Sequence, residues 1–134
     1  MEIDQSFPVC LEGQFLGGSE EGERSTGNLC TPGTHVYMAD TLVTAHCINS
    51  SSETIRGEEW VDFLLIVNGN ESCHHVINGD TVFSFQSPIY GGGNSASLFE
   101  SLEGQPVKKG TISLQSESHP IQFKDIELLR LGGI

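Results

Sequence analysis

Apolar and polar residues alternate through residues 110–131, GTISLQSESHPIQFKDIELLRL, in the pattern of half-buried β-strands. The apolar positions of these two stretches are Ile112 and Leu114, then Ile121, Phe123, Ile126 and Leu128. The pattern predicts strands over residues 111–115 and 121–128, joined by a Ser-His-Pro corner. Because the apolar face changes from odd to even positions, we expect a bulge or bend near Lys124 and Asp125.

A second run of strand-like segments precedes this one. Residues 59–67, EWVDFLLIV, are apolar on both faces and predict a central strand covered on both sides. Asn-Gly turns at residues 68–69 and 78–79 separate it from strands predicted at residues 72–77 and 81–85. The sequence therefore predicts a three-stranded antiparallel meander. His74 and His75 should face opposite sides of their strand, so they cannot chelate one metal together.

Residues 7–15, FPVCLEGQF, predict the first strand, followed by a charged, glycine-rich loop at residues 17–24. The apolar residues of this strand share one face, which places Cys10, Glu12 and Gln14 on the other. That polar face is either solvated or the floor of a cleft, and periodicity alone favours the solvated face.

Residues 26–52 have weak periodicity and predict a long, ordered loop that contains a short hairpin, with residues 36–38 facing residues 42–45. Long loops in compact domains tend to carry function. His35 and His46 lie here and are candidates for binding a metal or a substrate, although a lone histidine is more often structural. Residues 88–109 predict a further polar excursion.

The composition agrees with an all-β, antiparallel fold, because sixteen glycines and five prolines favour short strands and many turns. At 134 residues we expect a single domain over residues 1–134. The net charge of −12 makes nucleic acid and anionic membranes improbable partners. No apolar run approaches the roughly 20 residues of a membrane span, and MEIDQSFPV does not resemble a signal peptide.

The chain has four cysteines and no CxxC motif, so no zinc site is expected. Cys30 and Cys47 flank a loop-rich stretch. In an oxidising compartment a disulfide between them would contribute about 3 kcal/mol, and the sequence leaves the paired and the reduced states equally open. Cys10 and Cys73 fall in predicted strands, where free thiols are usually buried.

Several of these stretches together resemble the 3-keto-disaccharide hydrolase family. The resemblance rests on RGEEWVDFLLIVNGNESCHHVINGDTVFSF and KKGTISLQSESHPIQFKDIELLRL, with FPVCLEGQFLGG, GNLCTPGTHV and TAHCINSS upstream. It implies a concanavalin-like β-sandwich of jelly-roll type, exported by bacteria that degrade glycosides, and hence an extracellular or periplasmic location. Members usually carry further strands before the segment that matches FPVCLEGQF, which implies a sandwich truncated at its N-terminus. Such a sandwich has open strand edges, and a homodimer that covers them is expected.

The resemblance also implies a site. Glu12 and Gln14 match the Glu-x-Gln strand whose polar face lines the concave surface of the sandwich. His119 matches a position near the same cleft, and Gln115 and Glu117 belong to the same signature. For these last three residues, a corner held by side-chain to backbone hydrogen bonds is an equal alternative.

The chemistry that fits the resemblance is the cleavage of a 3-keto-glycoside. Glu12 would remove the acidified C2 proton as general base. A cation or the donors Gln14 and His119 would stabilise the enolate. The aglycone would then leave from C1 and water would add. His46, Gln115 and Glu117 are expected to contact the substrate.

Two other functions remain open: a carbohydrate-binding module and an inactive remnant of the family. A binding module usually presents aromatic platforms, and the only Trp and Tyr residues are Trp60, predicted to be core, Tyr37 and Tyr90. No cofactor and no metal site is expected. A calcium ion stays open in view of the acidic loops, although no Asp-rich loop of recognised spacing occurs.

Overall fold

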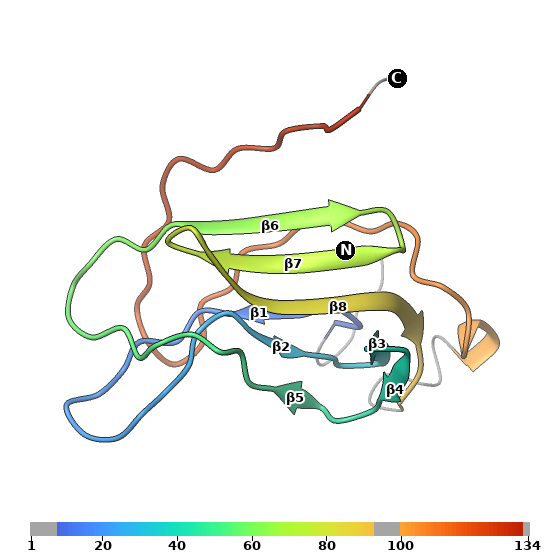
Figure 1. The fold of residues 1–134 in the computed structure, drawn as a ribbon, viewed down its shortest axis with the longest axis horizontal. Helices are drawn as coiled ribbons and strands as arrows, with labels where there is room; N and C mark the ends of the chain where they lie inside the picture. The colour runs from blue at the N-terminus through green and yellow to red at the C-terminus, as the bar shows by residue number, and fades with distance from the viewer. Residues whose placement is uncertain (1–7, 93–99, 133–134) are drawn as a thin grey trace.

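The computed structural model describes residues 8–92 and 100–132 and contains two antiparallel sheets (Figure 1). The smaller sheet has the order β1-β2-β5 and is formed by β1 (Glu12–Gln14), β2 (Asn28–Cys30) and β5 (Cys47–Ile48). The larger sheet has the order β4-β3-β8-β7-β6 and is formed by β3 (Thr34–Met38), β4 (Thr41–Val43), β6 (Phe63–Asn68), β7 (Ser72–Ile77) and β8 (Asp80–Tyr90). One 3-10 turn, η1 (Glu100–Leu102), follows. Since the described residues include no α-helix, the prediction of an all-β antiparallel fold is confirmed.

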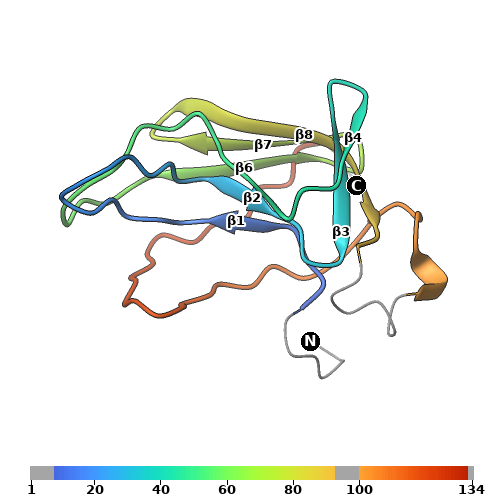
Figure 2. The ribbon, with the colours of Figure 1, turned by 90° about the horizontal axis from the view of Figure 1, so that it is seen from below.

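The two sheets pack as a sandwich, with the smaller one forming a separate layer against the larger (Figure 2). Leu29 of β2 is fully buried and packs against Val36, Cys73, Phe83 and Phe85 of the larger sheet. Four partly buried residues complete this cluster: Leu11, Met38, Val43 and Ile48. The hydrophobic core therefore lies between the layers, as β-sandwich packing requires.

His75 of β7 is part of this core and is 2% exposed. Its Nδ1 lies 2.7 Å from the carbonyl oxygen of Gly27, just before β2. Its ring lies within 6 Å of the ring centroids of Phe63, Phe83 and Phe85. Burial lowers the pKa of His75, and the Gly27 hydrogen bond opposes that shift. His75 is therefore structural, and His74 points away from it to Ser84, as predicted.

The three-stranded meander is confirmed, because β6 pairs with β7 and β7 pairs with β8. Asn78 and Gly79 both take positive φ angles, 48° and 89°, at the second turn. The position predicted for β6 is wrong. β6 is the edge strand of the larger sheet. Its two faces are not both covered, because the side chains of Leu64 and Val67 are each 55% exposed. Apolar residues on both faces suit a buried strand, but they do not show that a neighbour is there.

The predicted loop at residues 26–52 contains the expected hairpin, formed by β3 and β4. It also contains β2 and β5, which were not predicted. β2 pairs with β1 on one side and β5 on the other, so it is the middle strand of its sheet. These strands have three and two residues, too few to show an alternating pattern. The first predicted strand is likewise only three residues long in the structure.

The two strands predicted at residues 111–115 and 121–128 are wrong, since residues 108–131 contain no β-ladder. Asp125, where the pattern changes face, takes a positive φ of 51°, and the corner bends at residues 118–119 with a φ of 63° at Ser118. A strand needs a neighbour for its backbone hydrogen bonds, and the described residues provide none here. In Figure 1 only the end of this C-terminal segment extends beyond β6.

Within residues 8–92 and 100–132, no helix is long and apolar enough to cross a membrane.

Candidate functional site

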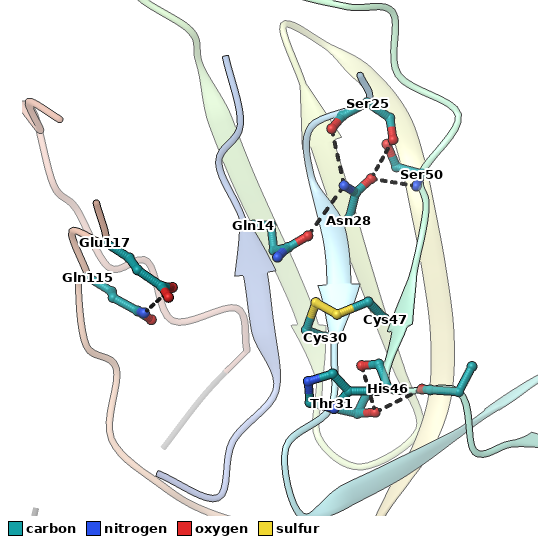
Figure 3. The surroundings of a disulfide bond; sticks show 11 residues. Gln14, Ser25, Asn28, Cys30, Thr31, His46, Cys47, Ser50, Gln115 and Glu117 are labelled. Carbon is teal, nitrogen blue, oxygen red and sulfur yellow. Dashed lines mark hydrogen bonds between the residues drawn. A yellow bond between two sulfur atoms is a disulfide. The ribbon is translucent and has the colours of Figure 1, made fainter. Parts of the chain in front are cut away.

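Gln14 at the end of β1 is held by the strand beside it. The side chain of Asn28 in β2 donates from Nδ2 to Gln14 Oε1 at 3.4 Å and to the Ser25 carbonyl at 3.1 Å. Asn28 Oδ1 accepts hydrogen bonds from Ser25 Oγ and from the Ser50 N–H. Asn28 is 3% exposed, so its amide is fixed, and it orients Gln14 with its amide nitrogen away from β2 (Figure 3).

A disulfide joins Cys30 of β2 to Cys47 of β5, which lie directly opposite each other in the smaller sheet. His46 immediately precedes Cys47, and its carbonyl oxygen accepts a hydrogen bond from the Thr31 N–H at 2.8 Å. Thr31 Oγ1 lies within 3.3 Å of the carbonyl oxygens of Ala45 and His46. β5 has only two residues, so the disulfide and Thr31 add to the short ladder that attaches this part of the chain to β2 (Figure 3).

These groups surround a pocket of about 320 Å³. Its lining residues are Glu12, Gln14, Cys30, Pro32, His46, Cys47 and Glu117. Four of the predicted site residues, Glu12, Gln14, His46 and Glu117, therefore share one pocket although they come from three separate parts of the chain. The volume lies at the lower end of the range for small-molecule sites.

Glu12 has an unusual electrostatic environment in this pocket. Partial burial raises its pKa, and the negative charge of Glu117 raises it further, whereas His46 opposes the shift. Cys10, two residues away, is a free thiol whose pKa is raised to about 11 by burial and by Glu12. A carboxylate with a raised pKa is a stronger base once it is ionised, as a proton-abstracting group requires.

The C-terminal segment contributes Glu117 to this pocket. Gln115 Nε2 donates to Glu117 Oε2 at 3.3 Å, and Figure 3 shows both side chains on the strand-like stretch that faces β1. His119 lies in the corner that follows and is exposed. Ser116 Oγ donates to its carbonyl at 3.0 Å, and its N–H donates to the Glu117 carbonyl at 2.8 Å. The structure thus places Gln115 beside the pocket, but His119 is not among the residues that line it.

A larger hollow of about 430 Å³ lies elsewhere, between the β3–β4 turn, the β6–β7 turn and β8. It is lined by Tyr37, Asp40, Glu71, Gln86 and Ser87, and by none of the predicted site residues. The pocket at Glu12 is the better candidate, because it combines a carboxylate of raised pKa with an amide and an imidazole. Among the described residues, no group of three or more His, Cys, Asp or Glu side chains is arranged to hold a metal ion.

Sequence analysis missed the residues that support this pocket. Asn28, Thr31 and Pro32 lie in the stretch predicted as a loop, and their types, Asn, Thr and Pro, are those of an ordinary turn. Asn28 contacts Gln14 and Thr31 contacts His46, 14 and 15 residues away in sequence, and Pro32 lines the pocket. Only the pairing of β2 with both of its neighbours reveals them.

Comparison with known proteins gives one family. A family model described as the 3-keto-alpha-glucoside-1,2-lyase-like domain matches residues 1–129. No curated protein and no solved structure matches the chain. The family match spans nearly the whole chain and confirms the resemblance to the 3-keto-disaccharide hydrolases. This chain, with its β-sandwich and its pocket at the Glu12 strand, belongs to the 3-keto-alpha-glucoside-1,2-lyase-like family.

Proposed function

We propose that this protein cleaves 3-keto-glycosides in the pocket formed by Glu12, Gln14, His46 and Glu117. The observation that carries the proposal is Glu12, a carboxylate of raised pKa beside an amide and an imidazole in a pocket of about 320 Å³. Family membership supports the same chemistry, since the family model is named for 3-keto-alpha-glucoside lyases. The disulfide supports action in an oxidising compartment, outside the cytoplasm.

The reaction begins with loss of the C2 proton, which the neighbouring 3-keto group makes acidic. Glu12 takes this proton, and the electron pair of the C2–H bond forms an enolate whose charge lies on the C3 oxygen. The enolate then re-forms the ketone and expels the aglycone oxygen from C1, leaving a C1–C2 double bond. Water adds its oxygen to C1 and returns a proton to C2, so that the overall change is hydrolysis of the glycosidic bond.

Gln14 stabilises the enolate in this proposal. Its Oε1 accepts from Asn28, so the amide nitrogen is the atom oriented to donate to a substrate oxygen (Figure 3). A fixed donor aimed at developing negative charge lowers the barrier more than a mobile one, because it does not reorganise during the reaction. Asn28 acts through Gln14 and is a positioning residue.

His46 and Glu117 complete the assignment. His46 lines the same pocket and is the imidazole available to protonate the departing aglycone oxygen. Glu117 raises the pKa of Glu12 and with Gln115 offers hydrogen-bond acceptors and donors to sugar hydroxyls. His119 lies outside the pocket lining and receives no step in this mechanism.

The test is turnover of a 3-keto-glycoside by Glu12→Gln, with Glu20→Gln in the exposed glycine-rich loop as matched control. Loss of a general base should lower kcat about 10²- to 10⁴-fold, whereas the control should keep the activity of the unmodified protein. Replacing the C2 hydrogen of the substrate by deuterium should slow the reaction. Unchanged kcat in Glu12→Gln, or equal rates with hydrogen and deuterium at C2, would contradict the proposal.

One observation favours a carbohydrate-binding module as the second candidate. Trp60, predicted to be core, is 55% exposed, which corrects that prediction and supplies an aromatic surface of the kind that stacks on sugar rings. Lys124 Nζ lies 4.2 Å from the centroid of its ring, however, and Trp60 does not line the pocket. In a binding module, Trp60→Ala would abolish sugar binding and Glu12→Gln would change it little. In the proposed enzyme, Glu12→Gln would abolish turnover and Trp60→Ala would change it little.

A further inference from the structure

The free edge of β6 is the first of two unsatisfied surfaces in this protein. No strand follows β6 in its sheet within the described residues. Its sequence, FLLIVN, contains no charge, proline or glycine, which are the usual devices that prevent an edge from pairing with another chain. Leu65 pairs with the buried His75 and therefore faces the core side of the sheet, yet it is 44% exposed. The apolar core is thus open along β6.

The C-terminal segment, residues 108–131, is the second unsatisfied surface. Its apolar side chains are widely exposed, and Ile126, Leu128, Leu129 and Leu131 are each between 69% and 79% exposed. The backbone hydrogen bond from His119 to Glu117 is the only one that this segment makes among the described residues. Phe123 packs against Phe15, with 6.3 Å between ring centroids, and holds the middle of the segment against the body. After Asp125, residues 126–131 are a strand-like stretch with no paired strand in the part of the chain that the structure describes.

The two surfaces match in length, and their charges do not oppose pairing. β6 has six residues, the same number as the stretch 126–131. The C-terminal segment contains four of the six Lys and Arg residues and three of the eighteen acidic ones, a net charge of +1. The rest of the chain has two basic and fifteen acidic residues, a net charge of −13. Glu59, Asp62 and Glu71 flank β6, so this edge repels a second acidic edge. The stretch 126–131 contains one acid, Glu127, and one base, Arg130, and therefore carries no net charge that would oppose pairing with β6.

We propose that a second copy of this chain covers these surfaces, with residues 126–131 of each copy added as a strand to β6 of the other. One chain supplies both a strand and an edge, so a two-fold symmetric pair satisfies both surfaces twice and then closes. The exposed leucines of each segment would cover the open core beside β6. The pair would also anchor the segment that carries Glu117, and so would hold one wall of the pocket in place.

The mass of the protein in solution tests this inference. Light scattering over a range of protein concentrations should give twice the 14.5 kDa of one chain, and the pair should persist in added salt because backbone hydrogen bonds and apolar side chains hold it. Leu64→Lys in β6 and Leu128→Lys in the segment should each give the single-chain mass. The matched control is Leu42→Lys in β4, at the opposite edge of the same sheet and 43% exposed, which should remain paired.

A single-chain mass for the unmodified protein at every concentration would overturn the inference. So would equal loss of pairing in Leu42→Lys and Leu64→Lys, or growth into species larger than two copies, which a closed two-fold pair does not form. Circular dichroism of each variant checks that the sheets remain. Mass is measured without substrate, so this result is independent of the cleavage chemistry, and Glu12→Gln should pair like the unmodified protein.

Discussion

The meander around β8 and the C-terminal segment have similar alternating sequences and opposite surroundings. Phe85 of β8 is 3% exposed and packs in the core with Phe83 and His75. Leu128 occupies an apolar position of the same kind of pattern and is 79% exposed. The difference is the neighbour: β8 has β3 on one side and β7 on the other, whereas no strand of the described residues pairs with residues 126–131. An alternating pattern indicates which face of a strand can be buried. Whether that face is buried depends on pairing with neighbouring strands.

The largest expected effect comes from removing one side chain from each region. Phe85→Ala should destabilise the protein by about 3–5 kcal/mol, because it leaves a cavity between the sheets. Leu128→Ala should change stability by less than about 0.5 kcal/mol in the single chain, because the side chain is already in water. Denaturant unfolding at low protein concentration measures both. Similar costs for the two variants would mean that the regions do not differ in the way the structure shows.

The disulfide gives the next largest effect, and it concerns the part of the smaller sheet that lines the pocket. The double variant Cys30→Ser, Cys47→Ser should lose about 3 kcal/mol of stability, because the unfolded chain regains the freedom of a loop whose ends are 17 residues apart. Substrate affinity should fall as well, since β5 positions His46. Reductant should destabilise the unmodified protein and leave the double variant unchanged.

Cys10→Ser is the matched control for this experiment, because Cys10 is a free thiol near the same pocket. It should retain both the disulfide and the response to reductant. A double variant as stable as the unmodified protein would show that the smaller sheet is held by strand pairing alone.

Local sequence signals predicted much of the fold. The Asn-Gly turns fixed the order β6, β7, β8, because this dipeptide adopts the positive φ angles that two-residue hairpins need. The change of apolar face at Lys124 and Asp125 coincides with a positive φ at Asp125. The edge position of β6 and the strands β2 and β5 could not be predicted, since they depend on contacts between segments far apart in sequence.

The candidate site also has features that local sequence predicts and features that depend on contacts between distant segments. The spacing of Glu12 and Gln14 places them on one face of a strand, which the sequence alone can predict. Whether that face was solvated or lined a cleft depended on β2, β5 and the C-terminal segment, none of which periodicity could place. The sequence also left the pairing of Cys30 with Cys47 open, and the register of β2 against β5 sets the two side by side.

The smallest and most specific effect tests whether the C-terminal segment lies against β1. Glu117 raises the pKa of Glu12 through its negative charge, so Glu117→Gln should lower that pKa. A general base works in its ionised form, and the rate therefore increases as pH rises through its pKa. The acid limb of the pH profile for kcat/KM should accordingly move to lower pH in Glu117→Gln. Glu103→Gln, an exposed carboxylate outside the pocket, is the control and should leave the limb in place. An acid limb that stays at the same pH in both variants would show that the charge of Glu117 does not affect the pKa of Glu12. The C-terminal segment would then lie away from the site in solution.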